Sequence, residues 1–300
     1  MKYPTIRIEG AILAADILDK IEKSDSITGQ KPVDFKIEGS NKVKDEIARA
    51  WADAQSYWGI FKRKRELLES DDKQTGTTET RNLWMTPFLG LLGYTLEFAK
   101  AEEVMGKSYA ISRRDKSLDG FPMHIMGFKD SLDKKRKDGG PRMSPHALVQ
   151  EYLNLTEHLY AIVSNGLQIR LLRDSSRLIK LSFLEFDLER MMDEEHYADF
   201  AILYRLMHYT RMPVSQDAVA ESLIETYHTN SLESGSRIRA GLSEAVESSI
   251  LSFSKGFLQH PKNDALRQWL EEGETHAKSQ EFYQWQLRLI YRLLFLIVIE

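Results

Sequence analysis

The chain has 300 residues, of which 42% are hydrophobic and 10% aromatic, and this composition excludes global disorder. The formal net charge of -4 excludes a strongly basic chain, so any nucleic acid must be bound by a local basic patch. The absence of cysteine excludes disulfides, thiolate metal sites and cysteine nucleophiles. We expect a cytoplasmic protein without a membrane partner.

The first half of the chain predicts helices followed by strands. Apolar residues at helical spacing indicate a helix over residues 41–69, and a polar linker at 70–80 separates it from a second helix over 81–93. Strand-like segments follow at 94–98, 108–113 and 122–128, and a charged, glycine-rich loop occupies 129–142. Ser144 as the N-cap and Pro145 at the first helical position predict a helix that extends to about residue 158.

The clearest local signal is a hairpin. An apolar segment at 160–164 is followed by Asn165-Gly166, a pair typical of tight hairpin turns, and by an alternating strand at 167–172. A third strand is expected over 177–187. Helices are then expected over residues 197–208, 216–227, 237–257, 264–271 and 280–299.

These elements predict an α+β fold, in which a mixed β-sheet flanked by helices precedes an all-helical region. We expect three parts: an N-terminal extension and helix at 1–80, a mixed-sheet domain at 81–190 and a helical region at 191–300.

Several motifs that would announce an activity are absent from the sequence. It has no phosphate loop of the Walker type, no G-x-G-x-x-G, no H-E-x-x-H, no G-x-S-x-G and no Asn-Pro-Pro-Tyr. The eight histidines are scattered without metal-ligand spacing, so we expect no metal site. His124 lies within an apolar strand, where a structural histidine is the favoured interpretation.

Four segments, in order along the chain, carry a family resemblance: SPHALVQEYLN at 144–154, YAIVSNGLQIRLLRD at 160–174, FLEFDLERMMDEEHYADFAILYRLMH at 183–208 and FYQWQLRLIYRLLFLIVIE at 282–300. The chain resembles the N-terminal region of methylase subunits of type II restriction enzymes and of phage-defence systems such as DISARM and BREX. The resemblance implies a nuclease-like PD-(D/E)xK domain at 81–190. It also implies that the uncapped C-terminal helix leads into an adenine methylase domain beyond these residues, where S-adenosylmethionine would bind.

The resemblance also implies positions for a nuclease site. In such nucleases, acids on neighbouring strands bind divalent cations and a lysine adds positive charge. By position, Asp119 corresponds to the first acid and Lys129 to the lysine, but Gly127 stands where the glutamate would be. Because glycine has no side-chain ligand, we expect a vestigial site with a gap beside Lys129. Mg²⁺ would be a cofactor only if Asp130 or Glu97 replaced the missing acid.

Basic residues near the sheet provide candidate contacts to DNA phosphates, with an inert solvated surface as the alternative. The candidates are four in the charged loop and two near the hairpin: Lys134, Lys135, Arg136, Lys137, Arg170 and Arg173.

The sequence therefore predicts a catalytically degenerate, nuclease-like DNA-contact and scaffold region of a DNA adenine methyltransferase. Its expected partners are DNA, the downstream methylase domain and other restriction or defence subunits. An active metal-dependent endonuclease and a pure protein-interaction module are the alternatives, and the acidic net charge favours the second of these.

Overall fold

The structure is a computed structural model, and it describes residues 2–14, 16–23, 27–70, 74–136, 142–174, 182–272 and 275–299. Contacts within the chain divide it into two compact units, Met1–Leu232 and Glu233–Glu300. The first unit contains a mixed sheet covered by helices, and the second is helical. The chain therefore has the α+β fold with a C-terminal helical region that the sequence predicts.

A seven-stranded sheet forms the centre of the first unit, in the spatial order β1-β9-β8-β7-β6-β5-β2. Strands β6 and β7 are parallel, and all other neighbours are antiparallel. The strands are β1 (Ile6–Glu9), β2 (Leu96–Phe98), β5 (Arg113–Asp115), β6 (Phe121–Ile125), β7 (Tyr160–Ser164), β8 (Gln168–Arg173) and β9 (Phe183–Asp187). A separate two-stranded sheet pairs β3 (Glu102–Val104) with β4 (Lys107–Tyr109).

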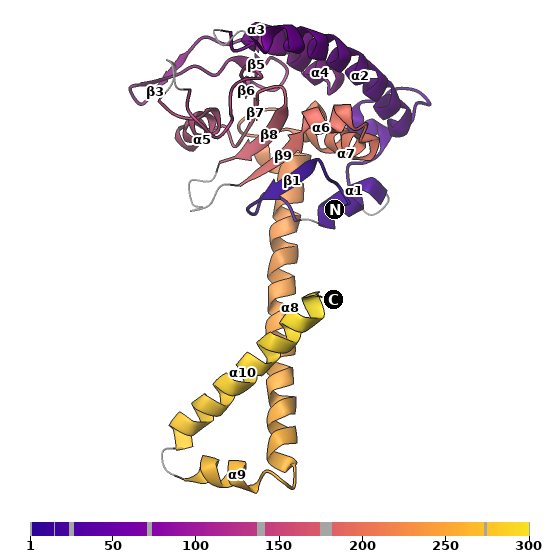
Figure 1. Cartoon of the computed structure of the whole chain (residues 1–300). Helices are drawn as coiled ribbons and strands as arrows, with labels where there is room; N and C mark the ends of the chain where they lie inside the picture. The colour runs from indigo at the N-terminus through magenta and orange to yellow at the C-terminus, as the bar shows by residue number, and fades with distance from the viewer. Residues whose placement is uncertain are drawn as a thin grey trace. The chain divides into compact units, whose positions relative to one another are not determined.

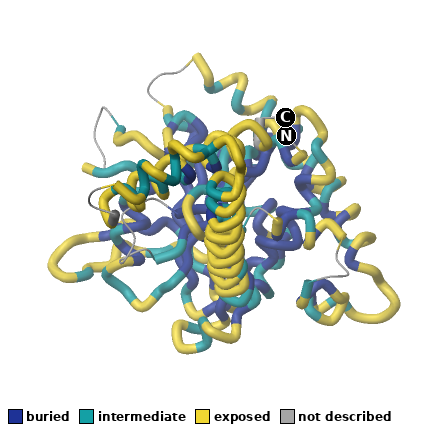
Figure 2. The backbone as a smooth tube through the Cα atoms, turned by 90° about the horizontal axis from the view of Figure 1, so that it is seen from below, coloured by how far each residue is buried: buried dark blue, intermediate teal, exposed yellow. Residues whose placement is uncertain are grey.

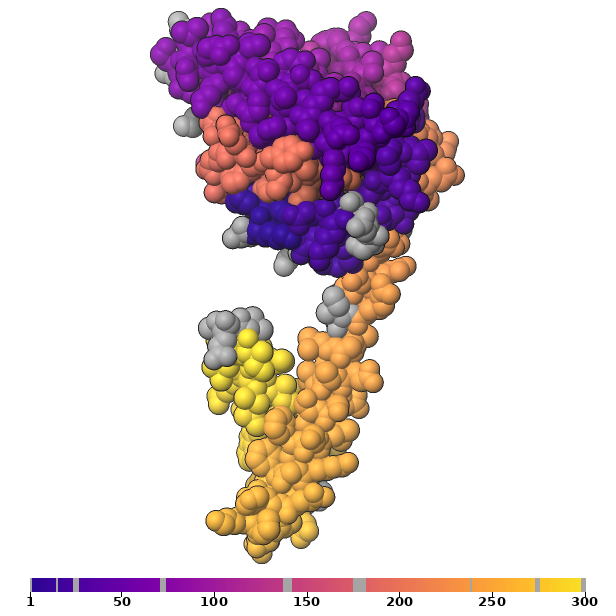
Figure 3. All heavy atoms as spheres, turned by 90° about the vertical axis from the view of Figure 1, so that its right-hand side faces the viewer, coloured from indigo at the N-terminus to yellow at the C-terminus, as the bar shows by residue number. Residues whose placement is uncertain are grey.

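Helices cover one face of the sheet and form the larger of two hydrophobic cores (Figure 1). In the space-filling view, α6 and α7 fill the space between α2 and the N-terminal β1–α1 segment (Figure 3). The elements of this layer are α1 (Asp16–Lys23), α2 (Val43–Leu68), α3 (Thr77–Glu79), the π-helix η2 (Thr80–Met85), α4 (Thr86–Leu91), α6 (Leu188–Asp193) and α7 (Tyr197–Met207).

Helix α5 (Pro145–Leu155) packs against the opposite face of the sheet and forms the second core. Its N-terminus is as the sequence predicts, because the Ser144 side chain accepts a hydrogen bond from the Ala147 amide and Pro145 opens the first turn. Strand residues alternate between the cores: Ile162 belongs to the larger core, whereas Ala161 and Val163 belong to the core beneath α5.

The turn between β7 and β8 is held against η2. Asn165 and Gly166 lie in this turn, where Gly166 has φ +84° and the Asn165 side chain accepts hydrogen bonds from the Leu167 and Gln168 amides. The Trp84 indole N–H donates to the Gly166 carbonyl at 2.7 Å, and Trp84 is fully buried. The contact fixes η2 beside the edge of the sheet at which β6 and β7 end.

Two strands of the sheet, β1 and β9, differ from the sequence-based expectations. Strand β1 comes from the expected N-terminal extension and pairs with β9, so this extension contributes a strand to the sheet. The strand expected over 177–187 begins at Phe183, and residues 177–181 of that range lie outside the described residues.

The two helices expected at 216–227 and 237–257 are wrong as separate elements, because α8 (Leu223–Gln259) begins inside the first range and continues without a break through the second. Gly235 costs a helix only about 1 kcal/mol relative to alanine, and cooperative propagation from both sides outweighs that cost.

The second unit consists of the C-terminal part of α8 together with α9 (Asp264–Glu271) and α10 (Thr275–Ile299). Trp269 and Trp285 stack with ring centroids 5.1 Å apart and join α9 to α10. Buried residues are concentrated in the first unit, whereas most described residues of the second are exposed or partly exposed (Figure 2). None of the described helices combines the length and the apolar composition required to cross a membrane.

Candidate nucleic-acid interface

The carboxyl ends of β6 and β7 meet at one edge of the sheet, because these two strands are parallel. The segment after β6 is bonded to the end of β7: the Met126 amide donates to the Ser164 carbonyl at 2.7 Å, and the Asn165 side chain donates to the Asp130 carbonyl at 2.8 Å. In α/β sheets, the carboxyl ends of parallel strands are the usual position of ligand sites. This edge is therefore the candidate functional site of the first unit.

Gly127 lies at this edge, but it leaves no gap. A Cβ atom at this position would come within 2.8 Å of the Thr75 carbonyl carbon and 2.9 Å of the Thr77 amide nitrogen. The expectation of an empty ligand position beside Lys129 is therefore wrong. Glycine is required here because the backbone of residues 75–77 crosses directly over it.

Asp119 and Lys129 lie beyond opposite ends of β6. Asp119 is exposed in the turn that precedes the strand and has φ +50°. The Lys129 ammonium group donates to the Leu68 and Glu69 carbonyls at 2.7 and 3.2 Å, at the C-terminal end of α2, where a cation interacts favourably with the helix dipole. Strand β6 alone separates them by about 16 Å at 3.3 Å per residue, so the structure does not bring them together.

Neither of the two acids considered as substitutes lies beside Asp119 in the sheet. Asp130 is at the carboxyl edge, where its carboxylate accepts from the Gly127 amide and pairs with Arg136. Glu97 is exposed on the edge strand β2, two strands away from β6. Among the described residues, no group of three His, Asp or Glu side chains is placed to hold a metal ion.

Three arginines surround the end of β6. The Arg81 Nε atom donates to the Ile125 carbonyl at 2.8 Å, the Arg113 guanidinium donates to the Ser112 carbonyl at 2.9 Å, and Arg136 forms a bidentate pair with Asp130. Burial lowers the pKa of Arg81, and the nearby Arg113 and Arg136 lower it further, while Asp130 opposes the effect. Two cations and one anion thus act on Arg81.

His124 is buried beside this group of arginines, on β6. It is 5% exposed, and neither ring nitrogen has a hydrogen-bond partner within the part of the chain that the structure describes, although the Ala110 backbone lies near the ring. Burial lowers the pKa of His124 to about 4, and the positive charges of Arg81 and Arg136 act in the same direction. The imidazole is consequently neutral at pH 7.

Comparison with known proteins finds no matching family model, no matching curated protein and no matching solved structure. The interpretation of this edge therefore depends on its own geometry and charge. That geometry contains guanidinium groups, which are well suited to bind phosphate oxygens.

The basic residues expected to contact DNA have different environments. Lys134 and Lys135 are exposed in the loop after β6, and Arg136 is partly exposed beside them. Lys137 lies outside the described residues. Lys134 and Lys135 directly precede Arg136, which belongs to the arginine group.

Arg170 and Arg173 are held in ion pairs. Arg170 is 2% exposed and lies between Glu185 on β9 and Asp133 in the loop, with an Nη1–Oδ1 distance of 2.6 Å to Asp133. Arg173 forms two hydrogen bonds to Glu225 at 2.7 and 3.0 Å. Because both guanidinium groups are already paired, a phosphate would have to displace a carboxylate to reach either one, and the structure favours a structural role for both.

The sequence did not single out Arg81 and Arg113. Arg81 lies in the segment that also contains Trp84, and its position becomes meaningful only when the hairpin turn holds η2 against the sheet. Arg113 lies on β5, in register with Met123 on β6. No local motif identifies either residue, since both reach the edge through pairing with distant segments.

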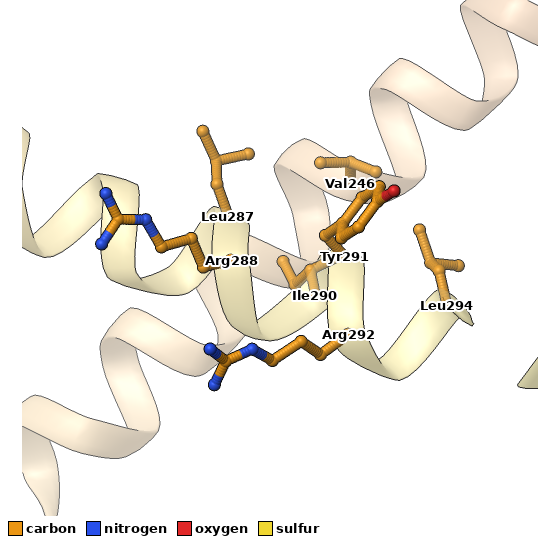
Figure 4. A pocket seen from close by; sticks show the side chains of 7 residues that line it. All are labelled: Val246, Leu287, Arg288, Ile290, Tyr291, Arg292 and Leu294. Carbon is orange, nitrogen blue, oxygen red and sulfur yellow. The ribbon is translucent and has the colours of Figure 1, made fainter. Parts of the chain in front are cut away.

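The second unit contains a different kind of surface. An open apolar hollow of about 450 Å³ lies between α8 and α10, with Val246 on one side and Leu287, Ile290, Tyr291 and Leu294 on the other (Figure 4). Its lining carries almost no hydrogen-bonding groups apart from two arginines and the tyrosine hydroxyl. Such an apolar hollow is suited to packing rather than to polar chemistry.

Proposed function

We propose that this chain is a DNA-contact and scaffold region with a catalytically degenerate, restriction-endonuclease-like domain. By its resemblance, it would belong to an S-adenosylmethionine-dependent DNA adenine methyltransferase of restriction–modification or phage defence. The methyl donor would bind a methylase domain beyond these 300 residues. Downstream partners would be that domain and other defence subunits.

The observation that carries the proposal is the group of three arginines at the carboxyl edge of β6. A hydrolytic metal site at this edge would require carboxylates that converge, and here Asp130 is engaged by Arg136. Guanidinium groups with flanking exposed lysines instead match the charge of a phosphate backbone. The antiparallel β5–β6 hairpin and the β6–α5–β7 crossover are compatible with a nuclease-like ancestry of the sheet.

Salt-dependent DNA binding tests the proposal. We expect fluorescence anisotropy with a labelled 20-base-pair duplex to show binding that weakens as salt increases. Each lost phosphate contact should reduce the slope of log K against log salt by about 1, so Lys134→Ala/Lys135→Ala should reduce it by about 2. The matched control is Arg63→Ala/Lys64→Ala on the exposed side of α2, which removes the same charge and should leave the slope unchanged.

If both double variants reduced the slope of log K against log salt equally, only the total charge of the protein would matter, and the proposed interface would be wrong. No binding at low salt would overturn the DNA-contact function itself. A parallel plasmid-nicking assay with Mg²⁺ or Mn²⁺ tests the active-endonuclease alternative. Robust cleavage by the wild type that is abolished by Lys129→Ala would establish that alternative.

Exposed apolar side chains on α10 favour protein interaction as a second function. Tyr291, Phe295, Leu296 and Ile297 are between 58% and 71% exposed. Exposed apolar groups of this size commonly mark interaction sites. Size-exclusion chromatography with light scattering tests for self-association through these residues, and Leu296→Glu/Ile297→Glu should abolish any dimer observed.

A further inference from the structure

His158 lies between the end of α5 and the start of β7, at the edge of the sheet where β6 and β7 begin. Its Nε2 atom lies 3.4 Å from the Arg114 Nη1 atom and 3.4 Å from the Gln216 Nε2 atom. A guanidinium group and an amide NH₂ group can only donate, so the lone pair of the imidazole Nε2 atom must accept both hydrogen bonds. The geometry therefore requires a neutral imidazole whose proton is on Nδ1.

Arg114 is held in place by partners other than His158. Its Nη2 atom donates to the Tyr152 hydroxyl at 2.7 Å and to the Glu102 carboxylate at 2.5 Å, and its Nη1 atom also donates to the Gly120 carbonyl at 2.9 Å. The Tyr152 ring stacks on the imidazole with ring centroids 6.1 Å apart. One side of His158 therefore faces a cation whose position is fixed by three other contacts.

The other side of His158 faces the 213–222 loop, which leads into α8. His158 and Gln216 line a small hollow beneath this loop, together with apolar side chains that include Leu118, Phe121 and Val219. Leu118 and Phe121 are buried. Within the described residues, Gln216 supplies the side-chain hydrogen bond that joins the loop to this edge of the sheet.

We infer that His158 is a pH-sensitive latch, which holds the 213–222 loop against the sheet only while its imidazole is neutral. A proton on Nε2 occupies the lone pair that accepts from Arg114 and Gln216, so both hydrogen bonds are lost and donors then face donors. Because Arg114 is fixed by its other partners, the imidazolium and Gln216 move apart. The loop opens and uncovers the apolar side chains of the hollow. This device does not depend on the proposed DNA contact.

The charged groups around His158 come from three other elements. Arg114 on β5 is the nearby cation, whereas Glu102 on β3 and Asp119 in the turn before β6 are anions. Burial lowers the pKa of His158 below its ordinary value of 6.5, and Arg114 lowers it further, while the two carboxylates oppose the effect. The closed loop therefore disfavours the protonated imidazole, in agreement with the hydrogen-bond geometry.

The remaining titratable neighbours do not change charge in the range of the latch. Burial raises the pKa values of Tyr152 and Tyr160, so both hydroxyls stay neutral in acid. Glu157, which precedes His158, and Asp217, which follows Gln216, are exposed to solvent.

The direction of the pH dependence follows from the two states of the loop. In the open state the imidazole is solvated, and its pKa returns to the ordinary value of 6.5. The open state thus binds a proton first as the pH falls. Its population should increase by up to about tenfold per pH unit below 6.5, until the pKa of the closed state is reached.

Hydrogen exchange of the full chain, followed by mass spectrometry at pH 7.5 and 5.5, tests the latch. The reference variant is His158→Gln, because the glutamine Oε1 atom accepts hydrogen bonds but does not titrate. Comparison of the same amides at the same pH removes the intrinsic pH dependence of exchange. We expect equal protection of the 213–222 loop at pH 7.5, and protection up to about tenfold lower in the wild type at pH 5.5.

The β3–β4 hairpin is an internal control, because the bond between Arg114 and Glu102 does not involve the imidazole. Its amides should be equally protected in both proteins at each pH. Equal protection of the 213–222 loop in the two proteins at pH 5.5 would overturn the latch. A wild-type loss that is equally large in the hairpin would also overturn it, because acid would then loosen the whole edge.

A second variant reverses the sign of the effect. Gln216 is exposed, so Gln216→Glu should leave the fold intact, which circular dichroism verifies. Its carboxylate pairs with the imidazolium and raises the His158 pKa, so the contact is present in acid and lost as the pH rises. The loop of this variant should be more protected than the wild-type loop at pH 5.5 and less protected at pH 7.5. Protection equal to the wild type at both pH values would show that Gln216 does not hold the loop, and the latch would be wrong.

Discussion

Replacement of Gly127 by alanine distinguishes two explanations of this glycine. If Gly127 marks only the loss of a catalytic acid, a methyl group should be tolerated. If it permits the close approach of residues 75–77, the added Cβ lies within 2.8 Å of the Thr75 carbonyl carbon and 2.9 Å of the Thr77 amide nitrogen. Carbon atoms in proteins pack at about 3.5–4.0 Å, so the crossing backbone must move by about 1 Å.

Movement of packed backbone by that amount costs about 1–3 kcal/mol of unfolding free energy. Urea unfolding followed by circular dichroism at pH 7.5 measures it. The matched control is Gly90→Ala in α4, where an added Cβ meets nothing within 4 Å and alanine should stabilise the helix by about 0.5–1 kcal/mol. Wild-type stability of Gly127→Ala would refute the close-approach explanation. By the same reasoning, Gly127→Glu should destabilise the protein and should not produce Mg²⁺-dependent plasmid cleavage.

Two further predictions concern the hairpin turn and the buried histidines. Gly166→Val should cost about 2 kcal/mol or more, because φ is +84° and the new Cβ would lie 2.5 Å from the Thr80 methyl group; an unchanged melting temperature would contradict this. Burial lowers the pKa values of His124, His146 and His208 to about 4, 4 and 3. The unfolded chain therefore binds protons first as the pH falls below 6.5, and each histidine should remove about 1 kcal/mol of stability by pH 5.5. Urea unfolding at pH 7.5 and 5.5 checks this, and His124→Gln should reduce the difference.

Local chemistry made parts of the fold predictable. The Asn165-Gly166 turn and the Ser144-Pro145 helix start depend on residues adjacent in sequence, and both features are in place. The pairing of β1 with β9 joins segments about 175 residues apart, so no local pattern could specify it. The continuity of α8 across Gly235 depends on cooperativity, which residue-by-residue propensities do not capture.

The site was less predictable than the fold, for a physical reason. A basic run in a loop can be recognised directly, as with Lys134 and Lys135, because exposure follows from composition. Arg81 follows a polar linker and His124 lies in an apolar strand, and the charges that act on each come from distant segments of the chain. The role of Gly127 also depends on a distant segment. A glycine in a sequence does not reveal whether a side chain has been lost or whether another part of the backbone approaches closely.

The attachment of the loop after β6 would have a consequence for the kinetics of the proposed DNA contact. Asn165 binds the backbone at Asp130, and Arg170 binds the side chain of Asp133, so the stem of the loop is anchored at two points before Lys134 begins. The conformational entropy of that stem is lost when the protein folds, and ordering the Lys134 and Lys135 side chains on a polyanion would cost about 0.5–1.5 kcal/mol each. Contacts made by such side chains form and break quickly, which would let the protein exchange rapidly between neighbouring phosphates along a duplex while its own backbone stays in place.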